Sequence, residues 1–118
     1  MSRYRAGITI LLLAYGSAAA AHPHLRMSIP AEGSVITAAP SQVTLGYSEV
    51  SRLLALSLQK GAEPAVKITS LPQQPAQQLT VALPALAPGV YQLRWRALGD
   101  DGHVTSGSVH FTLVAPRP

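Results

Sequence analysis

Apolar and polar residues alternate with a period of two along most of the chain after residue 24. The stretch VYQLRWRAL places its apolar side chains on one face and Gln92, Arg94 and Arg96 on the other, and SVHFTLV repeats the pattern. Such alternation predicts β-strands that are buried on one face only. The residues expected in the core are Tyr91, Leu93, Trp95, Val109 and Phe111.

Five shorter segments show the same alternation between turns rich in glycine and proline, while Pro30, Gly33 and Pro40 indicate a loop. About seven short strands, without a long helical pattern beyond the N-terminus, predict an all-β fold. We expect a seven-stranded Greek-key barrel or sandwich of immunoglobulin-like type. The residues expected on the buried faces of these segments are Leu25, Met27 and Ile29; Val43, Leu45 and Tyr47; Leu54, Leu56 and Leu58; Val66 and Ile68; and Leu79, Val81 and Leu83.

The N-terminus has a different character, because the basic start MSRYR is followed by the apolar run AGITILLLAYGSAAAA. Ala19 and Ala21 fit the small-x-small rule for cleavage, and the apolar run is too short to span a membrane. We therefore predict a secretory signal peptide at residues 1–21 and one mature domain at residues 22–118, with no membrane span after cleavage. The alternative is a retained N-terminal helix.

Composition narrows the function. The chain has no cysteine, and loss of Arg3 and Arg5 with the signal lowers the net charge from +4 to +2. The remaining basic residues are scattered along the sequence, which argues against a phosphate-binding patch and a nucleic-acid partner. Neither a serine nucleophile motif, nor HExxH, nor a phosphate-binding glycine loop occurs, so we do not expect an enzyme.

The sequence GDDGH suggests a metal-binding pair. In an extended chain, residues i and i+2 point to the same side, so Asp101 and His103 would direct a carboxylate and an imidazole to one ion. The alternative is a simple turn, because Asp-Asp-Gly is favoured at turns.

Cleavage after Ala21 would create a second pair of donors. As residue one, His22 offers its α-amine and its ring Nδ1 to the same metal, which must displace the proton of the amine. Such nitrogen-rich sites with a carboxylate suit Cu(II), with Zn(II) as a competitor. A site built on the third residue, His24, needs an N–H at the second residue, and Pro23 has none. His24 is therefore at most an auxiliary ligand.

Five segments together resemble the CopC family of bacterial periplasmic copper-resistance proteins. They are HPHLRMSIPAEGSV, VTLGYSE, ALAPGVYQLRWRAL, DDGH and TSGSVHFTL, which follow one another along the whole mature chain. The resemblance implies a Greek-key β fold and a Cu(II) site. Its ligands would be His22, Asp101 and His103, with Glu49 of GYSEV as a further ligand or a hydrogen-bond partner of the amine. Glu49 could instead be a solvated residue at the end of a strand.

Some members of that family carry a second site for Cu(I) in a methionine-rich loop. This chain has only Met1, lost with the signal, and Met27, expected in the core. Soft thioether sulfur is the ligand that Cu(I) prefers, so we expect a Cu(II)-only member.

The resulting hypothesis is a periplasmic Cu(II) carrier or buffer in copper resistance, homeostasis or uptake. The resemblance implies a CopD-type inner-membrane copper transporter as partner. Two alternatives stay open: a secreted immunoglobulin-like interaction module without a metal role, and a copper-dependent oxidative enzyme. Anionic ligands such as Asp101 stabilise Cu(II) over Cu(I) and argue against the enzyme.

Overall fold

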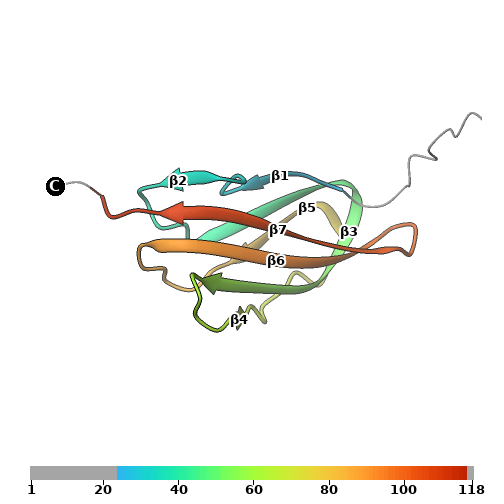
Figure 1. The fold of residues 1–118 in the computed structure, drawn as a ribbon. Helices are drawn as coiled ribbons and strands as arrows, with labels where there is room; N and C mark the ends of the chain where they lie inside the picture. Colours follow the sequence, from blue (N-terminus) through green and yellow to red (C-terminus); the bar gives the residue numbers. More distant parts are fainter. Residues whose placement is uncertain (1–23, 117–118) are drawn as a thin grey trace, which may run out of the picture.

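A computed structural model describes residues 24–116 of the chain as seven β-strands (Figure 1). It therefore confirms the all-β prediction, and the described residues contain no helix that could cross a membrane. The strands are β1 (Leu25–Ile29), β2 (Ser34–Ile36), β3 (Gln42–Lys60), β4 (Val66–Lys67), β5 (Ala76–Ala82), β6 (Gly89–Gly99) and β7 (Val104–Leu113).

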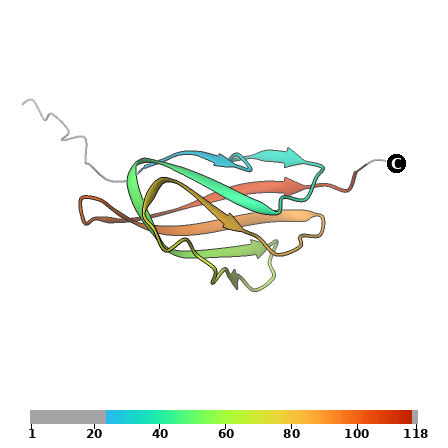
Figure 2. The same cartoon turned by 180° about the vertical axis from the view of Figure 1, so that it is seen from behind.

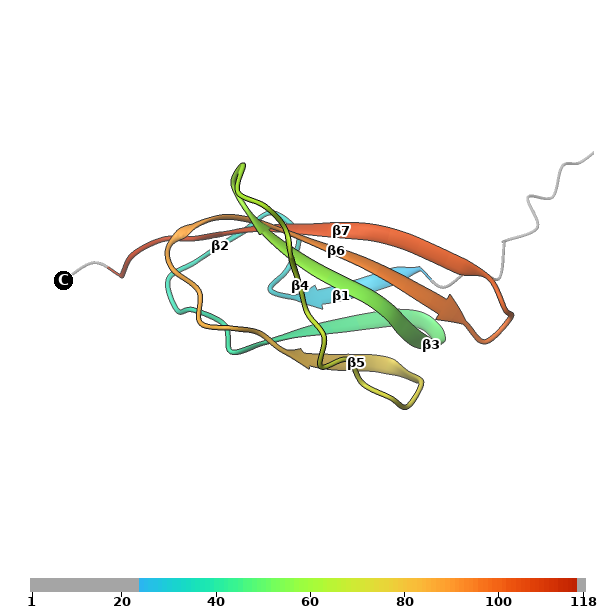
Figure 3. The same ribbon diagram turned by 90° about the horizontal axis from the view of Figure 1, so that it is seen from below.

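The strands form two layers that share β3. The first part of β3 pairs with β1 and β5, whereas the second part pairs with β6 and β4. β7 continues the second layer beside β6, and β2 joins β7 in parallel. Ser51 pairs with both Ala76 and Gly99, so it marks the point where β3 passes between layers. The two layers are visible from below in Figure 3 and from behind in Figure 2.

The core lies between these layers and contains all five residues predicted from the alternation of β6 and β7. The rings of Tyr91 and Phe111 stack with centroids 5.3 Å apart, and Tyr47 meets Trp95 edge-on at 5.1 Å. Strict alternation succeeded here because both strands are paired in an unbroken register from Gly89–Leu113 to Leu98–Val104.

The prediction for β1 was partly wrong. Met27 is 41% exposed and Ile29 is 59% exposed, while Leu25 packs against the core. Leu25 pairs with Tyr47, but Met27 already pairs with the neighbouring Gly46, so one extra residue lies between them. Such a bulge reverses the faces of all residues that follow it.

The middle of the chain also differs from its predicted pattern. The two segments expected as separate strands form the single strand β3, and β2 lies inside the predicted loop. A second register shift follows Leu53, so Leu53 is buried and Leu54 is 40% exposed. Val66 is also exposed, because β4 is a two-residue strand at the margin of its layer.

Four of the basic side chains, which the sequence suggested were scattered, lie close to one another in the fold. Lys67, Arg52, Arg94 and Arg96 are exposed and lie on β3, β4 and β6. These three strands are neighbours in one layer, and their register places the four residues on its outer face. Distant positions in the sequence thus become one basic face.

Candidate metal centre

The turn between β6 and β7 brings Asp101 and His103 together. The N–H of Gly102 donates to the carbonyl of Gly99 at 3.0 Å, and Gly99 donates to the carbonyl of His103 at 2.8 Å. Gly102 has φ of +84°, a conformation that glycine adopts without steric cost. The turn that the sequence offered as the alternative to an extended pair is therefore present, and Asp101 and His103 are brought together by this turn rather than by the period of an extended strand.

Two hydrogen-bond contacts orient this pair. The carboxylate of Asp101 accepts the N–H of His103 at 3.0 Å through Oδ1, and its Oδ2 lies 3.0 Å from His103 Nδ1. The imidazole is mostly exposed, while the carboxylate is largely covered. Donors bound at about 2 Å from one ion, at right angles, lie about 3 Å apart. The spacing of Oδ2 and Nδ1 therefore suits a shared cation.

Glu49 lies on β3 at the passage between the two layers. Its side chain is partly buried, and Oε1 is inaccessible to solvent without a hydrogen-bond partner among the described residues. Its backbone carbonyl accepts the hydroxyl of Ser51 at 2.9 Å, which holds the local backbone. A buried carboxylate oxygen without a partner is costly, so its retention calls for a partner such as a cation.

Backbone contacts bring the start of β1 and the β6–β7 turn to this part of β3. His24 donates its N–H to Ser48 Oγ at 2.9 Å and accepts the N–H of Ser48 at 2.8 Å. On the other side, Asp100 donates its N–H to the carbonyl of Val50 at 3.1 Å. All three segments lie at the right-hand end of the molecule in Figure 1.

The structure thus brings three of the four predicted ligands to one end: Glu49, Asp101 and His103. The fourth, His22, lies outside the described residues, as does the predicted signal peptide. Within residues 24–116, three or more His, Cys, Asp or Glu side chains nowhere gather closely enough to hold a metal ion. A complete site at this end would therefore need a donor from outside the described part.

The structure also contains a pair that the sequence did not predict. Glu32 accepts the backbone N–H of His110 at 2.7 Å, and its other oxygen lies 2.9 Å from His110 Nδ1. The bond from the backbone N–H, together with the histidine ring, lowers the pKa of the Glu32 carboxyl below its usual value. Because the two residues are 78 positions apart, no local sequence pattern signals the contact.

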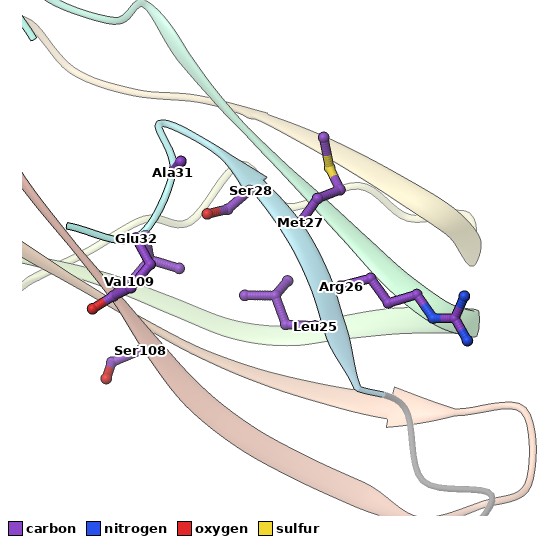
Figure 4. A pocket seen from close by; sticks show the side chains of 8 residues that line it. All are labelled: Leu25, Arg26, Met27, Ser28, Ala31, Glu32, Ser108 and Val109. Atoms are coloured by element: carbon purple, nitrogen blue, oxygen red, sulfur yellow. The ribbon is translucent and has the colours of Figure 1, made fainter. Parts of the chain in front are cut away.

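A groove of about 460 Å³ separates β1 from β7 (Figure 4). It exists because β1 pairs with β3 and β7 pairs with β6, so the two layers do not close there. Leu25 and Val109 contribute to its walls, and Glu32 is the one carboxylate that the described residues contribute to its lining. Since that carboxylate already contacts His110, the part of the chain that the structure describes offers a metal ion no comparable set of donors in this groove.

Comparison with known proteins agrees with the all-β fold. The CopC domain model matches residues 25–114, which include every described strand. The chain belongs to the CopC family. Copper resistance protein C of Pseudomonas syringae pv. tomato is 34% identical over 120 residues, covering 93% of this chain and 90% of that protein. Protein YobA of Escherichia coli K12 is 34% identical over 98 residues, or 79% of each chain.

Solved structures of the family share the fold. CopC from Methylosinus trichosporium OB3b superimposes with a TM-score of 0.68 at 26% identity, covering 82% of this chain and 98% of that one. PcoC, a methionine-rich copper resistance protein from Escherichia coli, gives a TM-score of 0.60 at 23% identity, covering 79% and 99%. Membership of the CopC family associates this chain with copper.

Proposed function

We propose that the chain is exported to the periplasm, cleaved after Ala21, and binds Cu(II) as a carrier or buffer. The main support is the Asp101–His103 pair, which lies at the same end of the molecule as Glu49, whose buried Oε1 has no partner among the described residues. The ligands would be His22, Asp101 and His103, with Glu49 as a further ligand or a partner of the α-amine. The protein would serve copper resistance, homeostasis or uptake.

The geometry of β1 supports a contribution from His22. His24 is hydrogen-bonded on both sides to Ser48, the neighbour of Glu49. A step of two residues spans at most about 7 Å. A new N-terminus at His22 would start within about 7 Å of the His24 backbone, which supports a contribution of its amine to a site at this end of the molecule.

The donor set determines which metal fits. An amine, imidazoles and carboxylates suit Cu(II) better than Mg²⁺ or Ca²⁺, and Zn(II) is the competitor. Among the described residues Met27 is the only methionine, and it lies on β1 rather than in a methionine-rich loop. This supports a Cu(II)-only protein, because Cu(I) prefers several thioether ligands.

The proposed role involves no catalytic step. Cu(II) would be held and then released to a partner, for which a CopD-type inner-membrane transporter is our candidate. Release is favoured at lower pH, because protons compete for the amine and imidazole nitrogens that bind the metal.

Intact-mass analysis of the exported protein, followed by Cu(II) EPR on the same sample, tests this proposal. We expect a chain that begins at His22 and one Cu(II) signal with nitrogen splitting. A matched variant, His110→Ala, removes a histidine at a distance from the centre and should leave the spectrum unchanged. Absence of stoichiometric Cu(II) binding would instead favour an immunoglobulin-like interaction module, and peroxide-dependent turnover after ascorbate reduction would favour an oxidative enzyme.

A further inference from the structure

The basic face consists of Arg52, Lys67, Arg94 and Arg96. It lies on the outer side of the layer formed by β4, β3, β6 and β7. Leu93, Trp95 and Ala97 of β6 are buried. Arg94 and Arg96 alternate with them along the strand and therefore point outward. Residues paired directly across strands share a face. Lys67 pairs with Ser57, which pairs with Arg94, and Arg52 pairs with the outward Leu98.

Three of the four cations, Lys67, Arg94 and Arg96, are closely spaced, and Arg52 lies further along β3 toward the β6–β7 turn. Residues two apart on a strand lie about 7 Å apart, and neighbouring strands are separated by about 4.8 Å. Arg94 and Arg96 are therefore about 7 Å apart at the backbone, and Lys67 lies two strands, or about 10 Å, from Arg94. These separations are within about one Debye length, so the charges repel one another in the isolated protein.

This charge has no ion-pair partner within residues 24–116, and the carboxylate that shares a pocket with one of the four is Asp100, which lines a pocket with Arg52. None of the four basic residues forms an ion pair with another described residue. Two of the acidic residues, Glu32 and Asp101, are engaged by histidines. The positions paired with Arg94 and Arg96 on the neighbouring strands carry small, uncharged side chains, namely Ala55, Ser57, Ser106 and Ser108.

A groove of about 320 Å³ lies beside these cations. Arg94, Arg96 and Lys67 contribute to its lining together with apolar side chains of β3 and of the segment after β4. The groove therefore combines a cationic rim with apolar walls. The apolar residues in this lining include Leu54, Ile68 and Leu71.

We propose that the basic face docks an extended, acidic segment of a partner protein. Carboxylates at alternate positions of an extended chain repeat every 7 Å or so, which matches Arg94 and Arg96. Guanidinium–carboxylate pairs are strong because they are often bidentate. An apolar side chain that takes the place of one of these carboxylates, on the same side of the extended segment, would enter the groove, which a lipid headgroup surface would leave unfilled.

The basic face reaches the end of the molecule that holds the candidate metal centre. Arg52 pairs with Leu98, one residue before Gly99 and the turn that carries Asp101. A segment docked along β6 would therefore lie beside that turn. The docking itself requires no copper, so it can be tested independently of metal binding.

Fluorescence anisotropy with a labelled peptide tests the proposal. The probe is a peptide in which glutamate alternates with serine and leucine replaces the central glutamate, so that leucine and the glutamates face the same side. We expect Arg94→Gln/Arg96→Gln to weaken binding about tenfold or more, equivalent to about 1.4 kcal/mol. The control, Arg26→Gln/Lys60→Gln, removes the same charge away from the basic face and should change the affinity less than twofold.

Three results would overturn the proposal: no binding of the peptide to the wild type, equal losses in the two double variants, or stronger binding to vesicles containing phosphatidylglycerol than to the peptide. A Cu(II) titration of each variant separates this from the proposed function. If Arg94→Gln/Arg96→Gln binds copper like the wild type but loses the peptide, the docking face is supported. If the protein binds the peptide but not copper, only the proposed role in copper handling is contradicted.

Discussion

Glu49 places a carboxylate oxygen in a covered position where the described residues give it no hydrogen-bond partner. Burying such a group costs free energy unless a cation or donor compensates it. The same residue is thus unfavourable for the metal-free fold and useful for binding a metal. Its neighbour Ser51 is fully buried and bonds to the Glu49 carbonyl, which fixes the backbone at this position.

Replacing Glu49 with glutamine should separate these two effects. We expect Glu49→Gln to weaken Cu(II) binding by about tenfold or more, while the free energy of unfolding of the metal-free protein stays equal or rises by up to about 1 kcal/mol. Competition titration with a copper chelator and urea unfolding measure the two quantities. An unchanged copper affinity would show that the carboxylate neither binds the metal nor holds the amine.

Glu32 should make the stability depend on pH. Its pKa is lower in the folded protein than in the unfolded chain, chiefly through the His110 N–H. Its contribution is therefore present above the unfolded value of about 4.5 and is lost as the pH falls through the lower folded value. Urea unfolding between about pH 7 and pH 3 should show a smaller acid-induced loss for Glu32→Gln than for the wild type.

The control for this prediction is Glu63→Gln, which removes a carboxylate from the exposed loop after β3. It should keep the acid-induced loss of the wild type. If Glu32→Gln and Glu63→Gln have identical pH profiles, the contact with His110 contributes nothing measurable to stability.

β7 must pass close to β6 where Gly107 pairs with Trp95. A Cβ atom at Gly107 would lie 2.7 Å from Trp95 Cζ2 and 2.9 Å from Cε2. The indole is rigid and buried against Tyr47, so it cannot move aside easily. The glycine is needed here for its missing side chain, since its φ is not positive.

Gly107→Ala should therefore destabilise the fold by about 1–3 kcal/mol through overpacking. Urea unfolding followed by tryptophan fluorescence measures the change and reports on Trp95 directly. Ser108→Ala, one position along on the outer face, should change the stability by less than about 0.5 kcal/mol. A neutral effect of Gly107→Ala would mean that β7 shifts easily relative to β6.

Copper should stabilise the whole molecule, because its proposed ligands come from the N-terminus, β3 and the β6–β7 turn. At a free Cu(II) concentration of about 100 times Kd, binding adds about 2.7 kcal/mol to the free energy of unfolding. We expect this gain only in protein that begins at His22. One extra alanine before His22 should abolish most of it, since the chelating amine moves away.

Thermal unfolding with and without Cu(II) checks this prediction, and the extra-alanine protein without metal serves as the stability control. An equal rise in Tm for the two proteins would exclude the N-terminal chelate. It would leave Asp101 and His103 as the main candidates for the bound metal.

Local patterns in the chain were sufficient to predict the all-β class, the core of β6 and β7, and the pairing of Asp101 with His103. These features depend on the period of a strand and on the chemistry of one turn, which neighbouring residues determine. Glu49 was assigned only through the family resemblance, and His22 remains a prediction because it lies outside the described residues.

Long-range pairing decided the rest. Two register shifts turned Met27, Ile29 and Leu54 outward, and the passage of β3 between layers brought Glu49 beside the β6–β7 turn. The basic face and the Glu32–His110 contact join residues from separate strands and loops. Alternation along one segment specifies which side chains share a face, but only the register between strands specifies which segments meet and which face is buried.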